Sequence, residues 1–236
     1  YSARIIRDLK VVPSPDWLKK RLELLGCRSV NNIVDITNYY LFELGHPLHA
    51  FDLDKLVRGF AGSRVRGLNI IVRRAIKGEE LTVINGDKKL LDENILIIAA
   101  GINSRTHELT NSRTSKPVAI AGIMGGKDTE VTAKTRNILI ESAIFNPILV
   151  RRSRQKLGLQ SESAYRFERG VNLETAKNAS LLAQKLICEL ANGAPCGNKS
   201  LGAQKSAGAL IKLDVAYVNR ILGTNIPALL IKKILS

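Results

Sequence analysis

Two of the three histidines lie close together in one polar stretch of the sequence. His46 and His49 stand on either side of Pro47, and carboxylates precede and follow them. Imidazole and carboxylate groups are common ligands of catalytic zinc and non-haem iron, but the HExxH spacing of zinc hydrolases is absent. A neutral imidazole, with an ordinary pKa of about 6.5, also suits general-base catalysis. These residues therefore allow a metal site or a general base at His49.

The polar residues of the same stretch also have a structural interpretation. Asp, Thr and Asn side chains form hydrogen bonds with nearby backbone groups and so favour turns and helix ends. On this interpretation Asp35, Thr37 and Asn38 cap turns, Asp52 caps the following segment, and His49 is a buried histidine with a hydrogen-bond partner. The residues alone leave the chemical and structural interpretations open.

A glycine-rich segment, AGIMGG at residues 121–126, directly follows the apolar run Val118–Ile120. Gly122 and Gly125 permit positive φ and close backbone approach, which suits a pocket floor or an anion-binding nest. The spacing matches neither the phosphate-binding GxxxxGK(S/T) loop nor the dinucleotide-binding GxGxxG loop. A tight turn without a ligand is the structural alternative.

Glu141 ends the otherwise apolar run that begins at Ile138. A buried carboxylate is costly unless it is paired, so Glu141 is either exposed at a strand end or a hydrogen-bonding group in a pocket. The segment SESAYRFERG, residues 161–170, alternates charged and aromatic side chains before a glycine. For it we expect a turn held by ion pairs, in which two arginines meet Glu162 and Glu168.

The charge balance points to a polyanionic partner. The chain has 236 residues, with 36 Lys and Arg against 21 Asp and Glu, a formal net charge of +15 and a pI near 10.0. Basic residues recur along the whole chain, which favours a surface that faces nucleic acid. Aromatic residues make up only 5%, too few for a platform that stacks successive bases. Contact with the phosphate backbone is the expected mode.

Composition also bounds the class of protein. Hydrophobic residues are 45% of the chain, which suits a packed core and excludes a disordered polypeptide. No apolar run approaches the ~18 residues of a membrane span, and Cys27, Cys188 and Cys196 form no CxxC pair. We therefore expect a cytoplasmic protein with no membrane partner. The chain starts at Tyr1 without an initiator Met and stops within an apolar-periodic stretch, so we expect a piece of a longer protein.

Periodicity and helix-end signals predict the helices. Ser14 is expected as the N-cap of the first helix, with Pro15 at its first helical position and Gly26 after its end. The predicted helices cover residues 14–25, 31–43, 146–157, 174–191, 215–222 and 226–235.

Runs of β-branched residues predict the strands of one mostly antiparallel sheet. They are Ile70–Val72, Leu81–Ile84, Ile95–Ile98, Val118–Ile120 and Ile138–Ile140. A polar exposed loop is expected over residues 101–116 and a linker over 193–208. The prediction is an α+β fold with helices packed around the sheet, a domain at 1–208 and a short helical fragment at 209–236.

Five motifs in this order resemble the β subunit of bacterial phenylalanyl-tRNA synthetase. The resemblance covers residues 1–208, the region of the subunit's tRNA-editing domain. The motifs are VDITNY at 34–39, GHPLHAFD at 45–52, AGIMGG at 121–126, ESAIFNP at 141–147 and RFERG at 166–170.

The resemblance implies post-transfer editing, in which the ester that joins tyrosine to the phenylalanine tRNA is hydrolysed. Glu141 would accept the phenol proton of tyrosine and so exclude phenylalanine. Thr37, Asn38 and His49 would line the reacting end and position the terminal adenosine and the attacking water. The family's site implies neither a metal nor a covalent nucleophile, and the tRNA's own ribose hydroxyl would assist.

The remainder of the implied pocket is backbone and small side chains. Ala121, Gly122 and Gly125 would close it, and Ser161 and Ser163 stand at its wall where the family commonly has Thr and Ala. An additional hydroxyl facing the amino acid is therefore expected. Two further departures are His46 in place of a common glutamine and a longer 101–116 loop.

The implied partners are tRNA(Phe) charged with tyrosine and, through the longer β subunit, the α subunit. No cofactor is implied for editing, whereas ATP and Mg²⁺ belong to aminoacylation by the parent ligase. One alternative is a tRNA-binding or subunit-packing module that keeps the fold without hydrolysis, suggested by Ser161 and Ser163. Another is a DNA-binding helix-turn-helix around Gly223, which the apolar Ile226, Leu229 and neighbouring residues disfavour.

Overall fold

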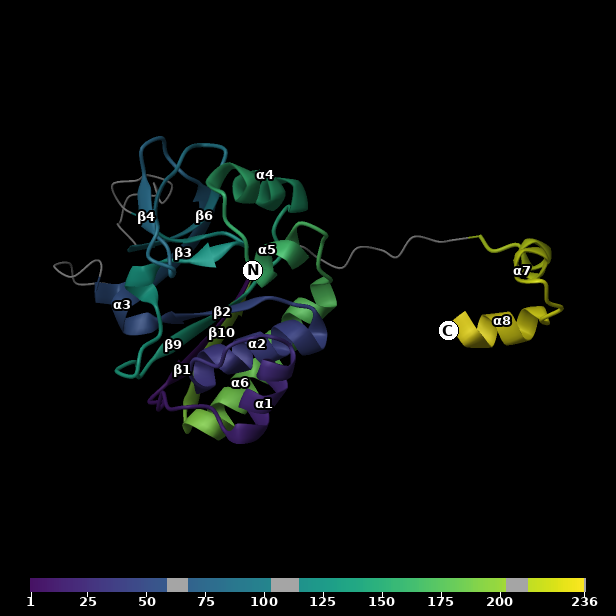
Figure 1. Ribbon diagram of the computed structural model, residues 1–236, viewed down its shortest axis with the longest axis horizontal. Helices are drawn as coiled ribbons and strands as arrows, with labels where there is room; N and C mark the ends of the chain where they lie inside the picture. Colours follow the sequence, from purple (N-terminus) through teal and green to yellow (C-terminus); the bar gives the residue numbers. More distant parts are fainter. Residues whose placement is uncertain (59–67, 103–114, 203–211, 236) are drawn as a thin grey trace. The chain divides into compact units, whose positions relative to one another are not determined.

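The structure is a computed structural model that describes residues 1–58, 68–102, 115–202 and 212–235 (Figure 1). Contacts divide the chain into two compact units, Tyr1–Gly202 and Ala203–Ser236. The domain boundary expected near residue 208 lies outside the described residues. The α+β class with antiparallel sheets is confirmed, because every pairing between named strands is antiparallel.

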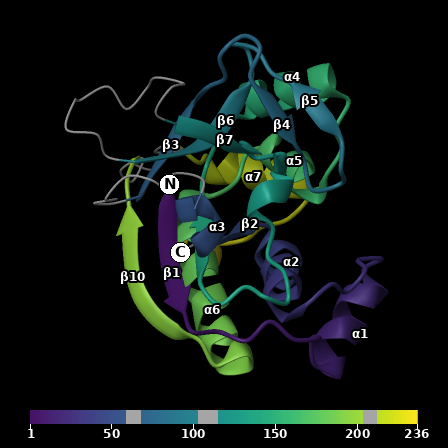
Figure 2. The ribbon, with the colours of Figure 1, turned by 90° about the vertical axis from the view of Figure 1, so that its left-hand side faces the viewer.

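Four strands from distant parts of the chain form one antiparallel sheet, called sheet A. In the order of the sheet they are β10 (Ala194–Ser200), β1 (Ser2–Arg7), β9 (Ile138–Ser142) and β2 (Leu48–Asp52). Figure 2 shows β10 and β1 running side by side. Because β9 is a central strand, Glu141 faces Ala3 of β1 on one side and His49 of β2 on the other.

One face of sheet A is covered by helices, which lie below it in Figure 1. They are α1 (Asp16–Leu24), α2 (Asn32–Leu44) and α6 (Leu173–Ala191). Asn31 caps α2 by accepting hydrogen bonds from two backbone N–H groups, and Gly45 ends it in the left-handed conformation. The first hydrophobic core, which includes Ile138 and Ile140, lies between these helices and the sheet.

A second four-stranded sheet, called sheet B, lies on the other side of sheet A. In order its strands are β3 (Leu68–Arg74), β6 (Leu96–Ile102), β7 (Ser115–Ile120) and β8 (Met124–Gly125). Next to it lie the small sheet of β4 (Glu80–Thr82) and β5 (Lys88–Leu90) and a short 3-10 helix, η1 (Lys127–Thr129). A buried ion pair of 2.7 Å joins Arg73 of β3 to Glu79.

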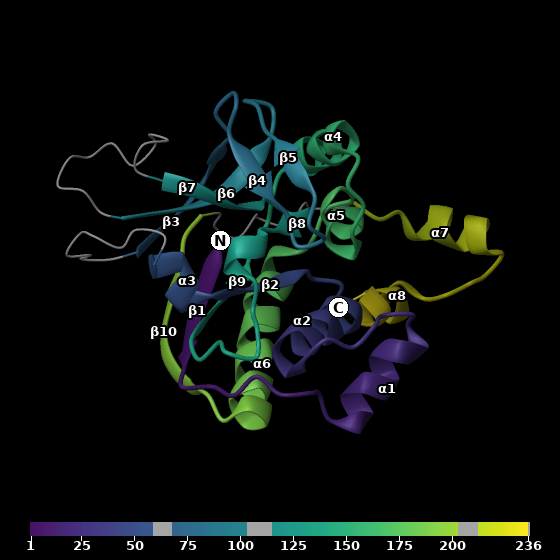
Figure 3. The same cartoon turned by 60° about the vertical axis from the view of Figure 1, so that its left-hand side comes forward.

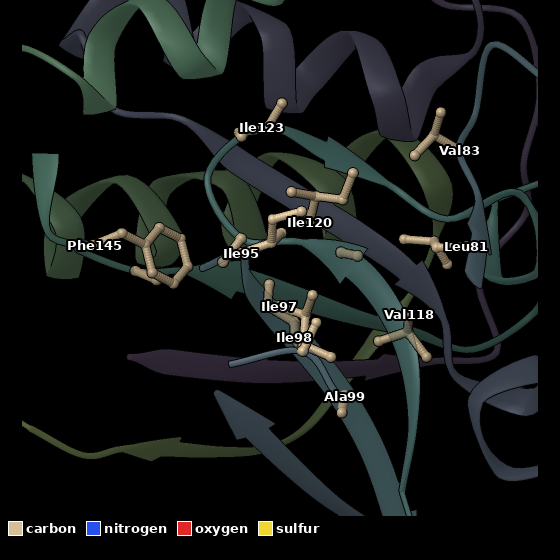
Figure 4. Close-up of a cluster of buried hydrophobic side chains, with 14 of the residues drawn as sticks. Leu81, Val83, Ile95, Ile97, Ile98, Ala99, Val118, Ile120, Ile123 and Phe145 are labelled. Carbon is tan, nitrogen blue, oxygen red and sulfur yellow. The ribbon is translucent and has the colours of Figure 1, made fainter. Parts of the chain in front are cut away.

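The second hydrophobic core fills the space between the two sheets. Leu139 and Phe51 reach it from sheet A, because successive side chains of a strand point to opposite faces. Figure 4 shows side chains of β4, β6 and β7 gathered in this core. The helices α4 (Pro147–Leu157) and α5 (Glu162–Phe167) close one end of it, and α3 (Leu53–Arg58) follows β2.

The second unit contains α7 (Val215–Leu222) and α8 (Ala228–Leu235). Asp214 caps α7, and Gly223 ends it in the left-handed conformation. In the described part of the chain, no helix is long and apolar enough to cross a membrane.

The predicted helices are confirmed, with small shifts of their ends. The first begins at Asp16, and its preceding residue, Pro15, has no capping side chain. Ser14, expected as that cap, instead donates a hydrogen bond of 2.6 Å to the Asp35 carboxylate. Its hydroxyl therefore joins the start of α1 to α2 rather than capping α1.

The prediction of a single sheet is wrong. The run Ile138–Ile140 belongs to sheet A, whereas the runs around Ile70, Ile97 and Val118 belong to sheet B. Sheet A was missed because its other strands carry weak strand signals. The expected linker at 193–208 contains β10, an exposed edge strand with Pro, Gly and polar residues, which edge positions tolerate. The expected loop at 101–116 starts and ends in strands, and its residues 103–114 lie outside the described ones.

Candidate active site

A small pocket opens between sheets A and B, next to α5. Glu141 of β9 and His49 of β2 line it from sheet A, and β6, β7 and β8 line it from sheet B. Its other walls are mostly apolar. The remaining lining residues are Pro47, Leu48, Ile98, Ala119, Ile120, Gly122, Ile123, Met124, Gly125, Phe145, Ser163 and Phe167.

Glu141 is the only acidic residue among those that line this pocket. Glu141 is 6% exposed, and its side chain forms no hydrogen bond within the described residues. Burial raises the pKa of this carboxyl from 4.5 to about 8. The carboxyl is therefore protonated and neutral at pH 7, and it can both donate and accept a hydrogen bond. Of the two sequence interpretations, the structure supports the pocket group and not the exposed strand end.

His49 lies directly opposite Glu141 in the β2–β9 register. Side chains at such positions are about 5 Å apart at their Cβ atoms. The His49 ring packs edge-on against Phe51, with centroids 4.4 Å apart. Its Nε2 atom is buried without a hydrogen-bond partner among the described residues. Burial lowers the pKa of His49 to about 4, so the imidazole is neutral at pH 7.

The glycine-rich turn lets the two sheets approach each other at the pocket. A Cβ atom at Gly125 would lie 2.4 Å from Cε1 and 2.5 Å from Nε2 of His49. Gly122 has a φ of +70°, and a Cβ there would lie 3.0 Å from the Phe145 ring. The turn is therefore part of the pocket wall, as the first interpretation predicts, and anion binding by its backbone stays a prediction. The glycines are required by the contacts of His49 and Phe145.

A second histidine lies behind the pocket wall. His46 is fully buried, and its Nε2 is 2.9 Å from the Ser142 hydroxyl. That hydroxyl already donates to the Ala176 carbonyl oxygen at 2.6 Å, so it accepts from His46 and the Nε2 atom carries the proton. The His46 ring packs edge-on against Phe167, a residue of the pocket wall. Burial lowers the pKa of His46 to about 4.

The structure brings five of the predicted site residues together. These are His49, Gly122, Gly125, Glu141 and Ser163. The aromatic residues Phe145 and Phe167 complete the wall and were missed, because a buried phenylalanine has the same sequence signal whether it lines a core or a pocket.

Four predicted site residues lie outside this lining. Ala121 is buried in the core between the sheets. The Ser161 hydroxyl caps α5 by accepting from the Ala164 N–H, and it donates to the Ile123 carbonyl oxygen at 2.7 Å. This corrects the expectation that it faces an amino acid. Thr37 and Asn38 lie on α2, where the Thr37 hydroxyl donates to the Val34 carbonyl oxygen. Their place at the reacting end stays a prediction.

The structural interpretation is confirmed for the two aspartates. Asp35 is buried and accepts hydrogen bonds from Ser14, Ser29 and the Val30 N–H. Asp52 accepts from the Lys55 N–H and caps the start of α3. Within the described residues, no group of three or more His, Cys, Asp or Glu side chains is placed to hold a metal ion.

The ion pairs predicted for residues 161–170 are confirmed, but the predicted turn is wrong, because Glu162–Phe167 forms the helix α5 with Ser161 as its N-cap. Arg166 pairs with Glu162 at 2.6 Å, and Arg169 pairs with Glu168 at 2.6 Å. A third arginine, Arg154 of α4, reaches the same Glu168 carboxylate at 2.9 Å. These contacts fix α5 against α4.

Comparisons with known proteins agree with the motif resemblance. The phenylalanine–tRNA ligase beta subunit of Syntrophus aciditrophicus is 42% identical, with 97% of this chain and 26% of that protein aligned. The same subunit of Moorella thermoacetica is 43% identical, with 100% and 27% aligned. This chain thus spans about a quarter of the length of these relatives.

A solved structure and a protein family also match. The structure is an N-terminal fragment of the phenylalanyl-tRNA synthetase beta subunit from Pyrococcus horikoshii, with 12% identity, a TM-score of 0.41, and 97% of this chain and 57% of that chain covered. The family is the B3/4 domain, which matches residues 1–192. Because this match covers most of the sequence, the chain belongs to the B3/4 domain family.

Proposed function

We propose that this domain hydrolyses the ester of tyrosine wrongly attached to tRNA(Phe). The observation that carries the proposal is the buried Glu141 carboxyl, which lies opposite His49 in a pocket whose other walls are mostly apolar. Two phenylalanine rings in the wall suit an aromatic amino acid. The proposed partners are tyrosyl-tRNA(Phe) and, through a longer β subunit, the α subunit of the synthetase.

Glu141 supplies the discrimination in this proposal. The neutral carboxyl of Glu141 both donates to and accepts from a phenol hydroxyl, so tyrosine satisfies it. Phenylalanine buries the same carboxyl without a partner, at a cost of about 1–3 kcal/mol. The aminoacylation pocket of a phenylalanine ligase is hydrophobic. Such a pocket discriminates against an amino acid that only adds a hydroxyl by a factor of only ~10². A second site that reads this hydroxyl removes the error.

The reaction is the addition of water to the ester carbonyl, which releases tyrosine and the free ribose hydroxyl. The neutral His49 imidazole can orient that water through its unprotonated ring nitrogen. Backbone groups of the turn at Gly122 and Gly125 lie at the same pocket. The proposal assigns no step to a metal ion or a cofactor, and Thr37 and Asn38 enter it only as predicted positions near the adenosine.

The pocket has to widen to admit a tyrosyl group. Its volume is about 50 Å³, far below the ~300 Å³ of ordinary ligand sites. Met124 lines it and is only partly buried, and a methionine side chain changes rotamer readily. The narrowness favours the second candidate function, a tRNA-binding module that retains the fold without hydrolysis.

The deciding experiment follows the loss of tyrosine from tyrosyl-tRNA(Phe) in the complete synthetase that carries this chain. We expect hydrolysis well above the spontaneous rate, a loss of ~10-fold or more in Glu141→Ala, and slow attack on phenylalanyl-tRNA(Phe). Glu141→Gln keeps the shape and a hydrogen bond and should retain more discrimination than Glu141→Ala. Hydrolysis by Glu141→Ala at the wild-type rate would remove Glu141 from this role, and no hydrolysis by the wild type would establish the non-catalytic module.

A further inference from the structure

The outer surface of α4 and α5 carries a concentration of positive charge. The helix α4 contains Arg151, Arg152, Arg154 and Lys156 and no acidic residue. Arg151, Arg152 and Lys156 are exposed, and Arg154 is partly buried. Arg169, just after α5, adds a fifth basic side chain to this surface. Figure 3 shows the two helices next to each other at one end of the sheet B side of the unit.

The same surface is hollowed. Two adjoining hollows, of about 520 and 430 Å³, share Arg154, Glu168 and Arg169 in their walls. Arg151 and Gln155 belong to the second hollow, and Tyr165 belongs to the first. Basic groups that surround a concave surface suit an anionic ligand, because their positive potentials add there.

The charges on this surface are only partly neutralised from within. Glu168 is the carboxylate shared by the two hollows, and it meets both Arg154 and Arg169. One carboxylate between two guanidinium groups leaves a net positive charge. Glu162, also in the wall of the first hollow, is paired with Arg166, and Lys156 of α4 is paired with Asp92. Arg154 uses its Nε for that contact, and no hydrogen bond from its terminal nitrogens is found among the described residues. For Arg151 and Arg152 no ion pair is found within the described part of the chain.

Tyr165 adds a group that can stack on a nucleobase. Its side chain is 55% exposed, and the Arg169 guanidinium lies over the ring, 3.6 Å from its centroid. Exposed aromatic rings and arginine planes are the groups on which proteins stack unpaired bases of RNA. An exposed ring beside phosphate-binding arginines favours single-stranded nucleic acid over an acidic peptide, which has no flat ring system to stack.

The helix α5 separates this surface from the candidate active site. Ser163 lines the pocket, whereas Ser161, Glu162 and Tyr165 of the same segment line the first hollow. An α-helix is about 10 Å across with its side chains. The Ser161 hydroxyl also holds the segment to Ile123 of the pocket wall. A ligand can therefore occupy the pocket with one end and the hollow with the adjoining part.

We infer that the surface formed by Arg151, Arg154, Tyr165 and Arg169, with the exposed Arg152 next to Arg151 on α4, binds the single-stranded 3′ end of the RNA whose aminoacyl group enters the pocket. Tyr165 stacks on one unpaired base, and the α4 arginines contact neighbouring phosphates. The identity of this RNA as a tRNA rests on the proposed function. The binding itself does not require hydrolysis, so the two are separable by experiment.

The test measures the binding of an RNA hairpin with a short single-stranded 3′ tail and no amino acid, by fluorescence anisotropy with the 236-residue chain. Each single-strand phosphate contact contributes a slope of about 0.7 to the salt dependence of binding. Arg151→Ala combined with Arg152→Ala should therefore weaken binding and lower that slope by about 1.4. The matched control, Lys10→Ala with Arg28→Ala, removes the same charge from two other exposed positions and should leave the slope unchanged, since charges more than ~8 Å away are screened at physiological salt.

Tyr165 variants test the stacking separately. Tyr165→Ala should weaken binding of the tailed hairpin about 5-fold or more, Tyr165→Phe should restore it, and neither should change binding of a blunt hairpin. Equal effects on tailed and blunt hairpins, or an arginine variant that binds like the wild type, would overturn the inference. Tighter binding of a labelled polyglutamate peptide than of the tailed hairpin would overturn it in favour of an acidic protein partner.

The controls separate this inference from the proposed function. Glu141→Gln should bind the tailed hairpin like the wild type, because the RNA carries no amino acid. If the complete enzyme does not hydrolyse the ester while the binding pattern holds, the proposed function fails and the RNA surface stands. If hydrolysis depends on Glu141 while the Tyr165 and α4 arginine variants bind the tailed hairpin like the wild type, the inferred RNA-binding surface is wrong and the proposed function stands.

Discussion

Glu141 and His49 respond in opposite directions to the same apolar surroundings. Burial disfavours the charged form of any group, so it raises the pKa of the acid to about 8 and lowers that of the imidazole to about 4. The result is a neutral acid opposite a neutral base at pH 7. Such a pair can bind a neutral hydroxyl by hydrogen bonding and does not attract ions, which is what the proposed recognition of tyrosine requires.

The Glu141 carboxyl should make the protein less stable at alkaline pH. Its folded-state pKa lies above its unfolded value of 4.5, so the folded state holds a proton that the unfolded chain has lost. Stability therefore falls as the pH rises towards 8, by about 1–2 kcal/mol between pH 6.5 and 8. Urea unfolding at these two pH values measures it. Glu141→Gln should abolish the fall, and Glu23→Gln on exposed α1 should keep it; a wild type with no fall would contradict the pKa.

At the scale of elements, the approach of β8 to β2 depends on a missing side chain. The His49 ring occupies the position that a Cβ at Gly125 would need. Gly125→Ala should lower the free energy of unfolding by about 1–3 kcal/mol, because a well-packed core resists added atoms. Thermal or urea unfolding checks this value. Gly197→Ala, in the exposed strand β10 with no atom within 4 Å of the new Cβ, is the matched control and should change little.

The Asp35 carboxylate joins the segments on both sides of α1 to α2, in addition to the packing of the two helices in the first core. Asp35 of α2 accepts from Ser14 before α1, and from Ser29 and the Val30 N–H after it. Asp35→Ala leaves these donors without their acceptor and should cost about 3 kcal/mol or more. Asp16→Ala, at a largely exposed side chain on α1, should cost under ~0.5 kcal/mol. Equal unfolding midpoints for the two variants would show that Asp35 does not join the helices.

For the whole unit of residues 1–202, sheet A is the element that both cores share. The first core covers one of its faces and the second core the other. His46 is buried behind the pocket wall and His49 lies at it, so protonation of either group opposes the packing between the layers. Protonation of His46 or His49 should therefore lower the free energy of unfolding of the whole unit.

The pH dependence of unfolding should have a maximum near pH 6.5. Both histidines have folded-state pKa values of about 4, below the ordinary 6.5, so the unfolded chain binds more protons and stability falls on acidification. Between pH 4 and 6.5, each histidine raises the free energy of unfolding by about 1.4 kcal/mol per pH unit as the pH rises. Above pH 4.5, Glu141 lowers it at the same rate and so cancels the contribution of one histidine. Unfolding between pH 5 and 8 measures the curve. A steady rise to pH 8 would contradict it.

Local signals in the sequence were sufficient for six helices and for several contacts, but not for the short helices α3 and α5. The caps at Asn31 and Asn146, and the glycines that end α2 and α4, act within one turn of the chain, so they can be read without tertiary contacts. The Arg166–Glu162 pair is likewise local, at i and i+4. Sheet A could not be read in this way, because β1 pairs with β9 and β10, more than a hundred residues away.

The sequence by itself determined the longer helices, the fold class, the basic character of the chain and, through five ordered motifs, its resemblance to a known family, whereas the short helices α3 and α5 were not predicted. Only the tertiary structure decided which residues form the pocket: it placed Glu141 opposite His49, added Phe145 and Phe167, and left Ser161 outside as a helix cap. It also decided that the Glu141 carboxyl is buried, which raises its pKa to about 8. The physical reason is that burial and strand register depend on neighbours distant in sequence, whereas helix signals depend on residues a few positions apart.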